Sequence, residues 1–428
     1  MRFDSDVALL GTGLAPLIAA SRFLSEGKSV LLLNPDRDFF LEDSELPLDP
    51  CLPALGPGSL RADRLEAHLP EQAFEVLSPL YPGSVEMWPA RASDPADYHD
   101  STAPHLRARS RLFAASGQDF ARLEDFYVEA ADAGLHPQLL EGMQAGKRFP
   151  GVAVASENVR GVMVPRICDV DVVPYRNGVL EFVRERVDPG GAERLLCGVS
   201  QVELMPGGVR FHAGGAAHTA RISDGVLVFW TPRLTPWILA QAKRAELPSE
   251  VLAQMMPAGL RHWEEWSLVS RTAIDPAVVG VTRDVAVWAE IEGSPQRRGV
   301  PAVSAGADVE HRLTVLRGGR LLPAGSATSG GESWASAESF EALGELLQGF
   351  LKWERFSVRS MRPRSILDWG APAGANEGRD PRQSMSRVLS WRDPFARVVS
   401  HCDGPIVDVV RSARDAAEAL LARDGGAE

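Results

Sequence analysis

The chain has little of three features that would each point to a particular class of protein. It has four cysteines in 428 residues, and they lie far apart without a C-x-x-C pair, so neither a disulfide framework nor a zinc site is predicted. No run of about 18 apolar residues occurs, so no membrane span is predicted. Basic residues number 45 against 57 acidic ones, and the net charge of −12 argues against a nucleic-acid partner.

No secretory signal is predicted at the start of the chain, because the acidic residues Asp4 and Asp6 precede the first apolar run. Together with the few cysteines, this predicts a cytoplasmic protein. The length exceeds the usual size of one domain, so two interlocked domains are expected.

The first residues contain a strand, a glycine turn, a helix and a second strand. Residues 7–10 are an apolar run, Gly11-Thr12-Gly13 follows, and residues 14–26 carry apolar side chains at helical spacing. Gly27 stands where a helix ends, and residues 30–33 are a second apolar run. The pattern predicts a β-α-β unit with buried parallel strands.

A glycine turn in this position favours the binding of a diphosphate. Gly11 allows the sharp turn, and Gly13 lets the backbone approach phosphate oxygens closely. The helix that follows offers free N–H groups, beginning with those of Leu14 and Ala15. Pro16 replaces the third glycine of the usual fingerprint, which the first helical turn tolerates because that N–H has no partner within the helix.

The end of the second strand departs from the dinucleotide pattern. An acidic side chain usually stands there and binds ribose hydroxyls, whereas this chain has Asn34. An amide oxygen can accept a hydrogen bond but lacks the strength that a charge gives. Asp36, two residues further on, is a candidate substitute.

The rest of the chain predicts an α/β protein with a discontinuous first domain. Residues 1–60, 160–235 and 390–428 are assigned to the dinucleotide-binding domain, and 61–159 to a helical insertion or lid. Residues 236–389 are assigned to a substrate-type domain with an antiparallel sheet. Helices are expected near 60–78, 118–146, 175–186, 335–353 and 405–422, and strands at 199–204, 209–212, 224–230, 267–273, 285–291, 312–316 and 398–399.

The motif from Asp6 to Leu14 and the run from Gly27 to Asn34 resemble the start of the amine-oxidase and amino-acid-oxidase class of FAD-dependent oxidoreductases. Residues 198–204, 224–232 and 404–417 resemble three later blocks of the same proteins. The resemblance implies a Rossmann-type FAD/NAD(P)-binding domain with an interleaved α+β substrate domain. It also implies FAD as cofactor and oxidation of a small amine, amino acid or related substrate by hydride transfer to flavin.

The resemblance also implies a set of site residues. For cofactor binding these are Gly11, Gly13, Leu14, Ala15, Asn34, Val202, Asp403, Gly404, Pro405 and Ile406. His401 adjoins the expected flavin edge, and Arg362, with Arg364 beside it, suits a substrate carboxylate. The plainer interpretations are a loop-capping histidine and surface arginines on a strand. No metal ligands are predicted.

Three weaker candidates have plainer interpretations as well. Cys402 could link flavin covalently, Trp263, Trp266 and Trp288 could line a pocket, and residues 325–331 could form a phosphate loop. Aromatic residues on strands more often belong to the core, and this glycine-rich stretch lacks the lysine of a P-loop.

Two alternatives to a flavin enzyme stay open. Gly11-Thr12-Gly13-Leu14 also resembles Rab GDP-dissociation inhibitors and Rab escort proteins, which share the fold without flavin and bind protein partners. An NAD(P)-using enzyme is the other alternative, although no second glycine fingerprint is visible.

Overall fold

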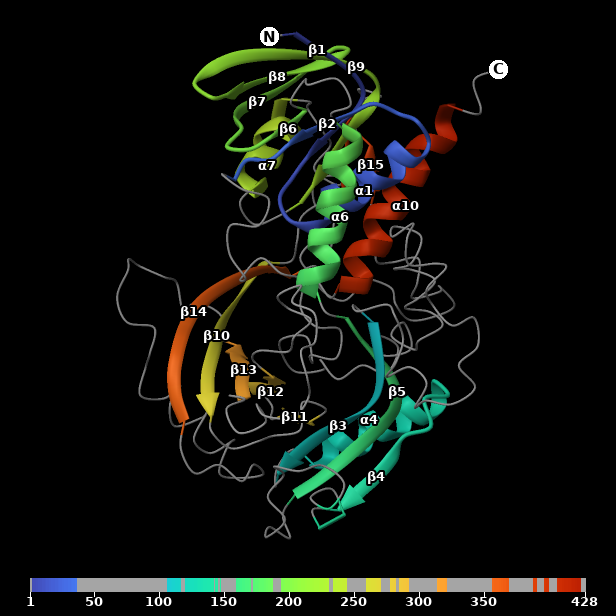
Figure 1. The fold of residues 1–428 in the computed structure, drawn as a ribbon, viewed down its shortest axis with the longest axis vertical. Helices are drawn as coiled ribbons and strands as arrows, with labels where there is room; N and C mark the ends of the chain where they lie inside the picture. Colours follow the sequence, from blue (N-terminus) through green and yellow to red (C-terminus); the bar gives the residue numbers. More distant parts are fainter. Residues whose placement is uncertain are drawn as a thin grey trace, which may run out of the picture.

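A computed structural model places the described parts of the chain in two β-sheets with helices packed against them (Figure 1). It describes residues 2–36, 106–116, 120–141, 143–144, 147, 159–170, 172–187, 194–230, 234–244, 259–270, 278–281, 285–291, 314–321, 356–368, 388–390, 396–399 and 406–424. The helices predicted near 60–78 and 335–353 and the glycine-rich stretch 325–331 lie outside these residues.

The first sheet has the strand order β15-β16-β9-β1-β2-β6. The strands in this order are β1 (Arg2–Leu10), β2 (Val30–Leu33), β6 (Leu195–Leu196), β9 (Ala216–Phe229), β15 (Val388–Ser390) and β16 (Ala396–Val399), and β7 (Ser200–Met205) and β8 (Gly208–Ala213) join the same sheet through β9. Strands β16, β9, β1, β2 and β6 run parallel, and β15 is an antiparallel edge. Three distant parts of the chain therefore meet in one sheet.

Residues 7–10 of β1 and the whole of β2 are buried on both faces of the sheet. Along β1, Val7 and Leu9 belong to the apolar cluster on one face, and Ala8 and Leu10 belong to the cluster on the other. All four side chains are at most 1% exposed. A strand covered on both sides has no polar face, which explains the continuous apolar run in the sequence.

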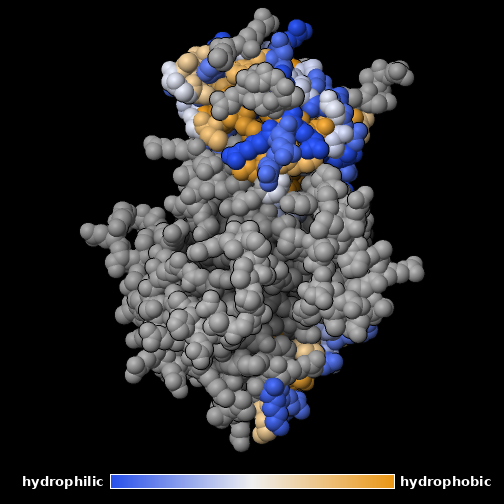
Figure 2. Space-filling model, viewed as in Figure 1, coloured by the Kyte–Doolittle hydropathy of each residue, from blue (hydrophilic) through white to orange (hydrophobic). Residues whose placement is uncertain are grey.

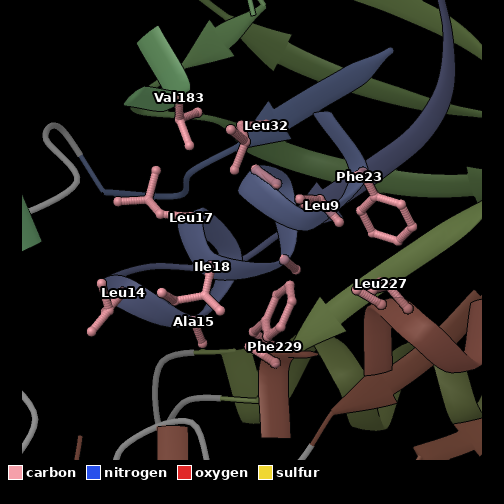
Figure 3. Close-up of a cluster of buried hydrophobic side chains, with 14 of the residues drawn as sticks. Leu9, Leu14, Ala15, Leu17, Ile18, Phe23, Leu32, Val183, Leu227 and Phe229 are labelled. Carbon is pink, nitrogen blue, oxygen red and sulfur yellow. The ribbon is translucent and has the colours of Figure 1, made fainter. Parts of the chain in front are cut away.

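Three helices cover one face of this sheet: α1 (Leu14–Ser25), α6 (Val172–Val187) and α10 (Ile406–Asp424). Figure 1 shows α1 beside both α6 and α10, and the contacts agree. Figure 3 shows Leu17 and Ile18 of α1 in one cluster with Leu9 and Phe229 of the sheet. Figure 2 shows hydrophilic residues at the surface over α6, whereas residues 14–21 of α1 are all buried, so α1 is covered on nearly all sides.

The other face carries a hairpin and a short helix. Strands β7 and β8 pair antiparallel. After a tight turn, β8 also pairs antiparallel with β9. Helix α7 (Thr235–Arg244) packs on the same side, where Trp230 and Ile238 are buried. Helices, a mostly parallel sheet and a hairpin layer make up the Rossmann-type α/β arrangement, which confirms the predicted fold class.

The second sheet has the order β14-β10-β13-β12-β11-β3-β5-β4. Its strands are β3 (Leu106–Ser116), β4 (Gln138–Glu141), β5 (Val159–Val170), β10 (Gly259–Ser270), β11 (Val278–Val281), β12 (Val285–Ile291), β13 (Thr314–Leu321) and β14 (Phe356–Asp368). All pairs are antiparallel except β11 with β3. Helix α4 (Phe120–Asp132) packs against it through Phe126, whose ring lies 5.2 Å from that of Phe113.

Within the described part of residues 61–159, helix is found in α4 and at residues 143–144 and 147, and the helix expected over 118–146 is interrupted by β4. Two strands, β3 and β4, flank α4, and β5 begins at Val159 and pairs with both. The sequence pattern did not reveal β5 or β4, because residues 161–164 of β5 are all buried and β4 buries only Leu140. Neither strand shows the alternation that marks a half-buried strand. The domain limits themselves stay predictions.

Candidate functional site

The carboxyl ends of the parallel strands form the edge on which the candidate site is built. From β1 the chain passes through α1 to β2 on one side, while β9 lies on the other side of β1. The crevice at such a reversal of strand order is where open α/β sheets bind ligands. The N–H of Gly11 donates to the carbonyl of Leu33 at 3.1 Å, so the glycine turn is fixed to the end of β2.

Gly11 is required by packing. A Cβ atom at this position would lie 2.8 Å from Cβ of Phe229 at the end of β9. Neither atom can rotate away, because both are bonded directly to the backbone. Glycine therefore lets the β1–α1 turn approach β9, and a role of Gly11 in cofactor binding stays a prediction.

Gly13 is required by conformation. Its φ of 77° and ψ of −151° lie in a region that is essentially restricted to glycine. It is the N-cap of α1, and no side chain of the described residues caps the helix there. No atom of the described residues lies within 4 Å of the place where a Cβ would stand. The turn thus combines glycine-only geometry with open space beside the helix N-terminus.

The first turn of α1 offers two backbone donors beyond the N-cap. Leu14 and Ala15 occupy the first two helical positions, and the described residues supply no backbone acceptor for their N–H groups. Pro16 is the third, where its missing N–H removes one donor without breaking a bond inside the helix. Its side chain is buried. The helix can therefore present its positive end to an anion with one donor fewer than usual.

Asn34, at the end of β2, is fully buried, and both ends of its amide are in contact with other residues. Oδ1 accepts the N–H of Asp36 at 3.0 Å, and Nδ2 donates to Sγ of Cys197 at 3.7 Å. The side chain therefore closes a tight turn and joins β2 to the chain after β6. Its predicted ribose contact stays a prediction, and sequence reasoning missed Cys197, which is 163 residues away.

Val202, predicted to pack near adenine, lies in an irregular part of β7. The pairing with β8 shifts register between Ser200 and Glu203, and Gln201 has a positive φ of 51°. The carbonyl of Val202 accepts the indole N–H of Trp237 in α7 at 2.7 Å. A bulge of this kind redirects the residues that follow it, and Trp237 fixes its position. No motif in the sequence pointed to Trp237.

Most of the predicted flavin-side residues fall outside the described part of the chain. His401, Cys402 and the loop Asp403-Gly404-Pro405 are among them, and Ile406 is the first residue of α10. For the other candidates the structure gives the backbone position. Arg362 and Arg364 lie on β14 opposite Glu265 and Trp263, Trp266 is also on β10, and Trp288 is on β12.

A polar cluster at the opposite, amino edge of the sheet was also missed. Oδ2 of Asp6 accepts the N–H and the hydroxyl of Ser29, both at 2.7 Å, and Ser223 donates to Oδ1 at 3.2 Å. Burial raises the pKa of the Asp6 carboxyl, but these hydrogen bonds and the charge of Lys28 outweigh it and hold the pKa below its ordinary value. The cluster joins the α1–β2 turn to β9 and is structural.

In the described ranges, no three or more His, Cys, Asp or Glu side chains are grouped so as to hold a metal ion. Among the helices that the structure describes, none is long and apolar enough to cross a membrane.

No protein-family model and no curated protein matches the sequence. Solved structures match over nearly the whole chain. NikD, an unusual amino acid oxidase essential for nikkomycin biosynthesis, has a TM-score of 0.58 in its open form, with 14% identity over 98% of this chain and 94% of its own. L-proline dehydrogenase from P. horikoshii has a TM-score of 0.58, with 10% identity over 99% and 94%. L-α-glycerophosphate oxidase from Mycoplasma pneumoniae, solved with FAD bound, has a TM-score of 0.55, with 11% identity over 98% and 95%.

The chain has the fold of the FAD-dependent oxidoreductases. At this level of identity the shared property is the fold, and the resemblance inferred from the β-α-β motif is confirmed at that level. Within the FAD-dependent oxidoreductase fold, the residues at the carboxyl edge can be compared with the needs of a dinucleotide. The glycine-only geometry of Gly13, the space beside it and the uncapped α1 fit a diphosphate. The amide of Asn34 does not match the acidic group expected for ribose.

Proposed function

We propose that the chain binds FAD along the carboxyl edge of the first sheet and oxidises a small amine, an amino acid or a related substrate. The observation that carries this proposal is the β1–α1 turn. Gly13 has a backbone conformation restricted to glycine, and the space beside it leads to an uncapped helix N-terminus. Packing explains Gly11, but it does not explain why Gly13 has a glycine-only conformation beside open space.

Two kinds of support bear on the chemistry. When bound, FAD supplies the hydride acceptor, so the protein has to position a C–H bond and exclude water. Solved structures that share the fold include an amino acid oxidase, a proline dehydrogenase and a glycerophosphate oxidase. In the proposal, Arg362 binds a substrate carboxylate and His401 contacts flavin or substrate. The proposal also includes a cytoplasmic location for the protein.

The first experiment is an absorbance spectrum of the purified protein, followed by release and quantification of bound flavin. We expect the visible bands of an oxidised flavin and about one FAD per chain after reconstitution. Colourless protein that takes up no added FAD would overturn the proposal.

A pair of glycine variants tests the turn directly. Gly13→Ala adds a Cβ where the diphosphate is proposed to lie, and we expect FAD affinity to fall at least about 10-fold. Gly27→Ala is the matched control, because Gly27 also has a positive φ, 74°, with no described atom within 4 Å of a Cβ. Both variants strain the backbone by about 1–3 kcal/mol. If both lose FAD equally, the effect is due to strain and the proposed site is wrong.

A non-catalytic binding protein of the same fold is the second candidate function. The engagement of Asn34 within the protein and the missing donor at Pro16 favour it, because both weaken a nucleotide site. Stoichiometric FAD in the purified protein would count against this alternative. Absence of flavin together with a stable complex with one protein partner would support it.

A further inference from the structure

The two sheets are directly connected where β5 is followed by α6. Strand β5 ends at Val170 and α6 begins at Val172, so Asp171 alone separates them. A single intervening residue limits the distance between those two ends to about 7 Å. Strand β10 of the second sheet also follows a helix of the first, α7, but residues 245–258 lie between them. Among the described elements, β5 is therefore the strand of the second sheet that is most closely connected to a helix covering the first sheet.

Helix α6 is packed on the first sheet along its whole length. Its buried apolar side chains recur at helical spacing from the first turn to the last. They are Tyr175, Val179, Leu180, Val183 and Val187. These side chains share one cluster with α1, and Figure 3 shows Val183 in that cluster with Leu17 of α1. A shift of α6 would therefore disturb the packing of α1.

Strand β5 is equally well fixed in the second sheet. It pairs with β3 on one side and with β4 on the other. The three side chains in its middle, Val162, Met163 and Val164, are at most 1% exposed. Val162 lies opposite Phe113, whose ring contacts Phe126 of α4. Displacement of β5 must move the N-terminal end of α6 as well, because the connection between them is too short to absorb it.

We infer that the β5–α6 junction makes the opening of β5 depend on the packing of α6 against α1, so that a cofactor bound at the N-terminus of α1 also orders the second sheet. The second half of this inference rests on the proposed function. A ligand that binds only the packed form of α1 shifts the protein away from forms in which α1 and α6 have separated. Coupling of this kind is reciprocal, so an ordered β5 also favours cofactor binding.

The first test compares the hydrogen exchange of flavin-free and FAD-loaded protein by mass spectrometry of peptides. We expect the amides of residues 161–164 in β5 to exchange at least about threefold more slowly when FAD is bound. Residues 263–266 in β10 are the internal reference, and their exchange should change by less than about 1.5-fold. Equal protection of both strands would mean that FAD stabilises the whole protein uniformly, and it would overturn the inference.

A pair of insertions tests the short connection itself. Gly-Ser-Gly-Ser placed directly after Asp171 lengthens the junction with flexible residues, and it should abolish the FAD-dependent protection of β5 while FAD is still bound. The same insertion after Gly134 is the control, because Gly134 is exposed in the turn between α4 and β4. That variant should keep the protection. Full protection of β5 in the Asp171 insertion would overturn the inference.

A pair of valine variants tests the connection without a ligand, and it decides the inference if the insertion after Asp171 does not fold. Val183→Ala weakens the contact of α6 with α1, and in flavin-free protein it should raise the exchange rate of residues 161–164 at least about threefold. Val209→Ala is the matched control, because Val209 is also 0% exposed but lies in β8 on the other face of the first sheet. Both changes should lower the thermal midpoint by similar amounts. A similar rise of β5 exchange in both variants would reflect only a general loss of stability and would overturn the inference.

The outcomes also distinguish this inference from the proposed function. If the wild type binds FAD but the exchange of β5 stays unchanged, the flavin proposal stands and the coupling is absent. If the wild type binds no FAD, the proposed function fails, and the two valine variants decide whether the opening of β5 depends on the packing of α6.

Discussion

At the scale of single residues, Asp6 shows how one carboxylate can stabilise a sheet edge. It accepts two hydrogen bonds from Ser29 and one from Ser223, while Lys28 is paired with Asp224 at 2.9 Å. These contacts connect strands β1 and β9 to the turn that precedes β2. The depressed pKa of Asp6 reflects these donors.

We predict that Asp6→Asn lowers the free energy of unfolding by about 1–3 kcal/mol at pH 7, since it weakens hydrogen bonds to a charged group. Because the folded pKa lies below the unfolded one, the contribution of Asp6 is fully present above the unfolded pKa near 4. It is lost as pH falls through the folded pKa. Urea unfolding at several pH values should therefore show a flatter acid limb for the variant.

Asp4→Asn is the control for this prediction, because it removes the same charge from an exposed position on the same strand. Its unfolding free energy should stay within about 0.5 kcal/mol of the wild type. Equal destabilisation by both variants would mean that net charge, and not the Ser29 and Ser223 hydrogen bonds, is responsible.

At the scale of elements, the sequence predicts those parts whose burial is uniform or whose turns are chemically marked. Strands β1 and β2 were predicted from the apolar runs 7–10 and 30–33, because parallel strands covered on both faces are apolar throughout. Helix α1 was predicted between them, directly after the glycine turn. The end of α1 was also predicted, since Gly27 has a positive φ and its N–H bonds to Leu24. These are local properties that a single sequence carries.

Pairings between distant segments could not be predicted in the same way. Strands β3 and β5 form hydrogen bonds with each other although they are far apart in sequence, and β4 pairs over only four residues. At the site, the amide of Asn34 is hydrogen-bonded to Cys197, and the carbonyl of Val202 is hydrogen-bonded to Trp237. A sequence pattern gives the residue type at each position, but it does not show which partner its polar atoms meet. The roles of His401 and Arg362 therefore stay predictions.

Helix α10 packs beside α1 and contributes small residues to their shared apolar cluster. Ala413, Ala416 and Ala417 of α10 are 0% exposed in the cluster that also contains Ala19 of α1. We predict that Ala417→Leu destabilises the protein by about 1–3 kcal/mol, because the added atoms have no space without backbone movement. The shift of the denaturation midpoint of this variant from that of the wild type measures the destabilisation.

Ala419→Leu makes the same chemical change at an exposed position on the same helix, and it should alter stability by less than about 0.5 kcal/mol. Alanine and leucine have similar helix propensities, so the comparison isolates packing. If the two variants behave alike, α10 is not closely packed against α1.

At the scale of the whole molecule, the candidate site exists only when distant parts of the chain come together. The turn at residues 11–16, the turn at 34–36 and the end of β9 are adjacent in the first sheet, although they are up to about two hundred residues apart in sequence. An unfolded chain does not assemble these parts and cannot bind the cofactor at this site. Cofactor binding and folding must therefore be thermodynamically linked.

We predict that FAD at 100 times its Kd stabilises flavin-free protein by about 2.7 kcal/mol. This corresponds to a thermal midpoint higher by on the order of 5 °C, measured by circular dichroism. Riboflavin at the same concentration lacks the diphosphate and the adenosine, so it should give a much smaller shift. Gly13→Ala should reduce the FAD shift, whereas Gly27→Ala should preserve it, since only Gly13 adjoins the helix N-terminus. Equal shifts by FAD and riboflavin would place the stabilising contacts at the isoalloxazine ring and leave the glycine turn without a role in binding.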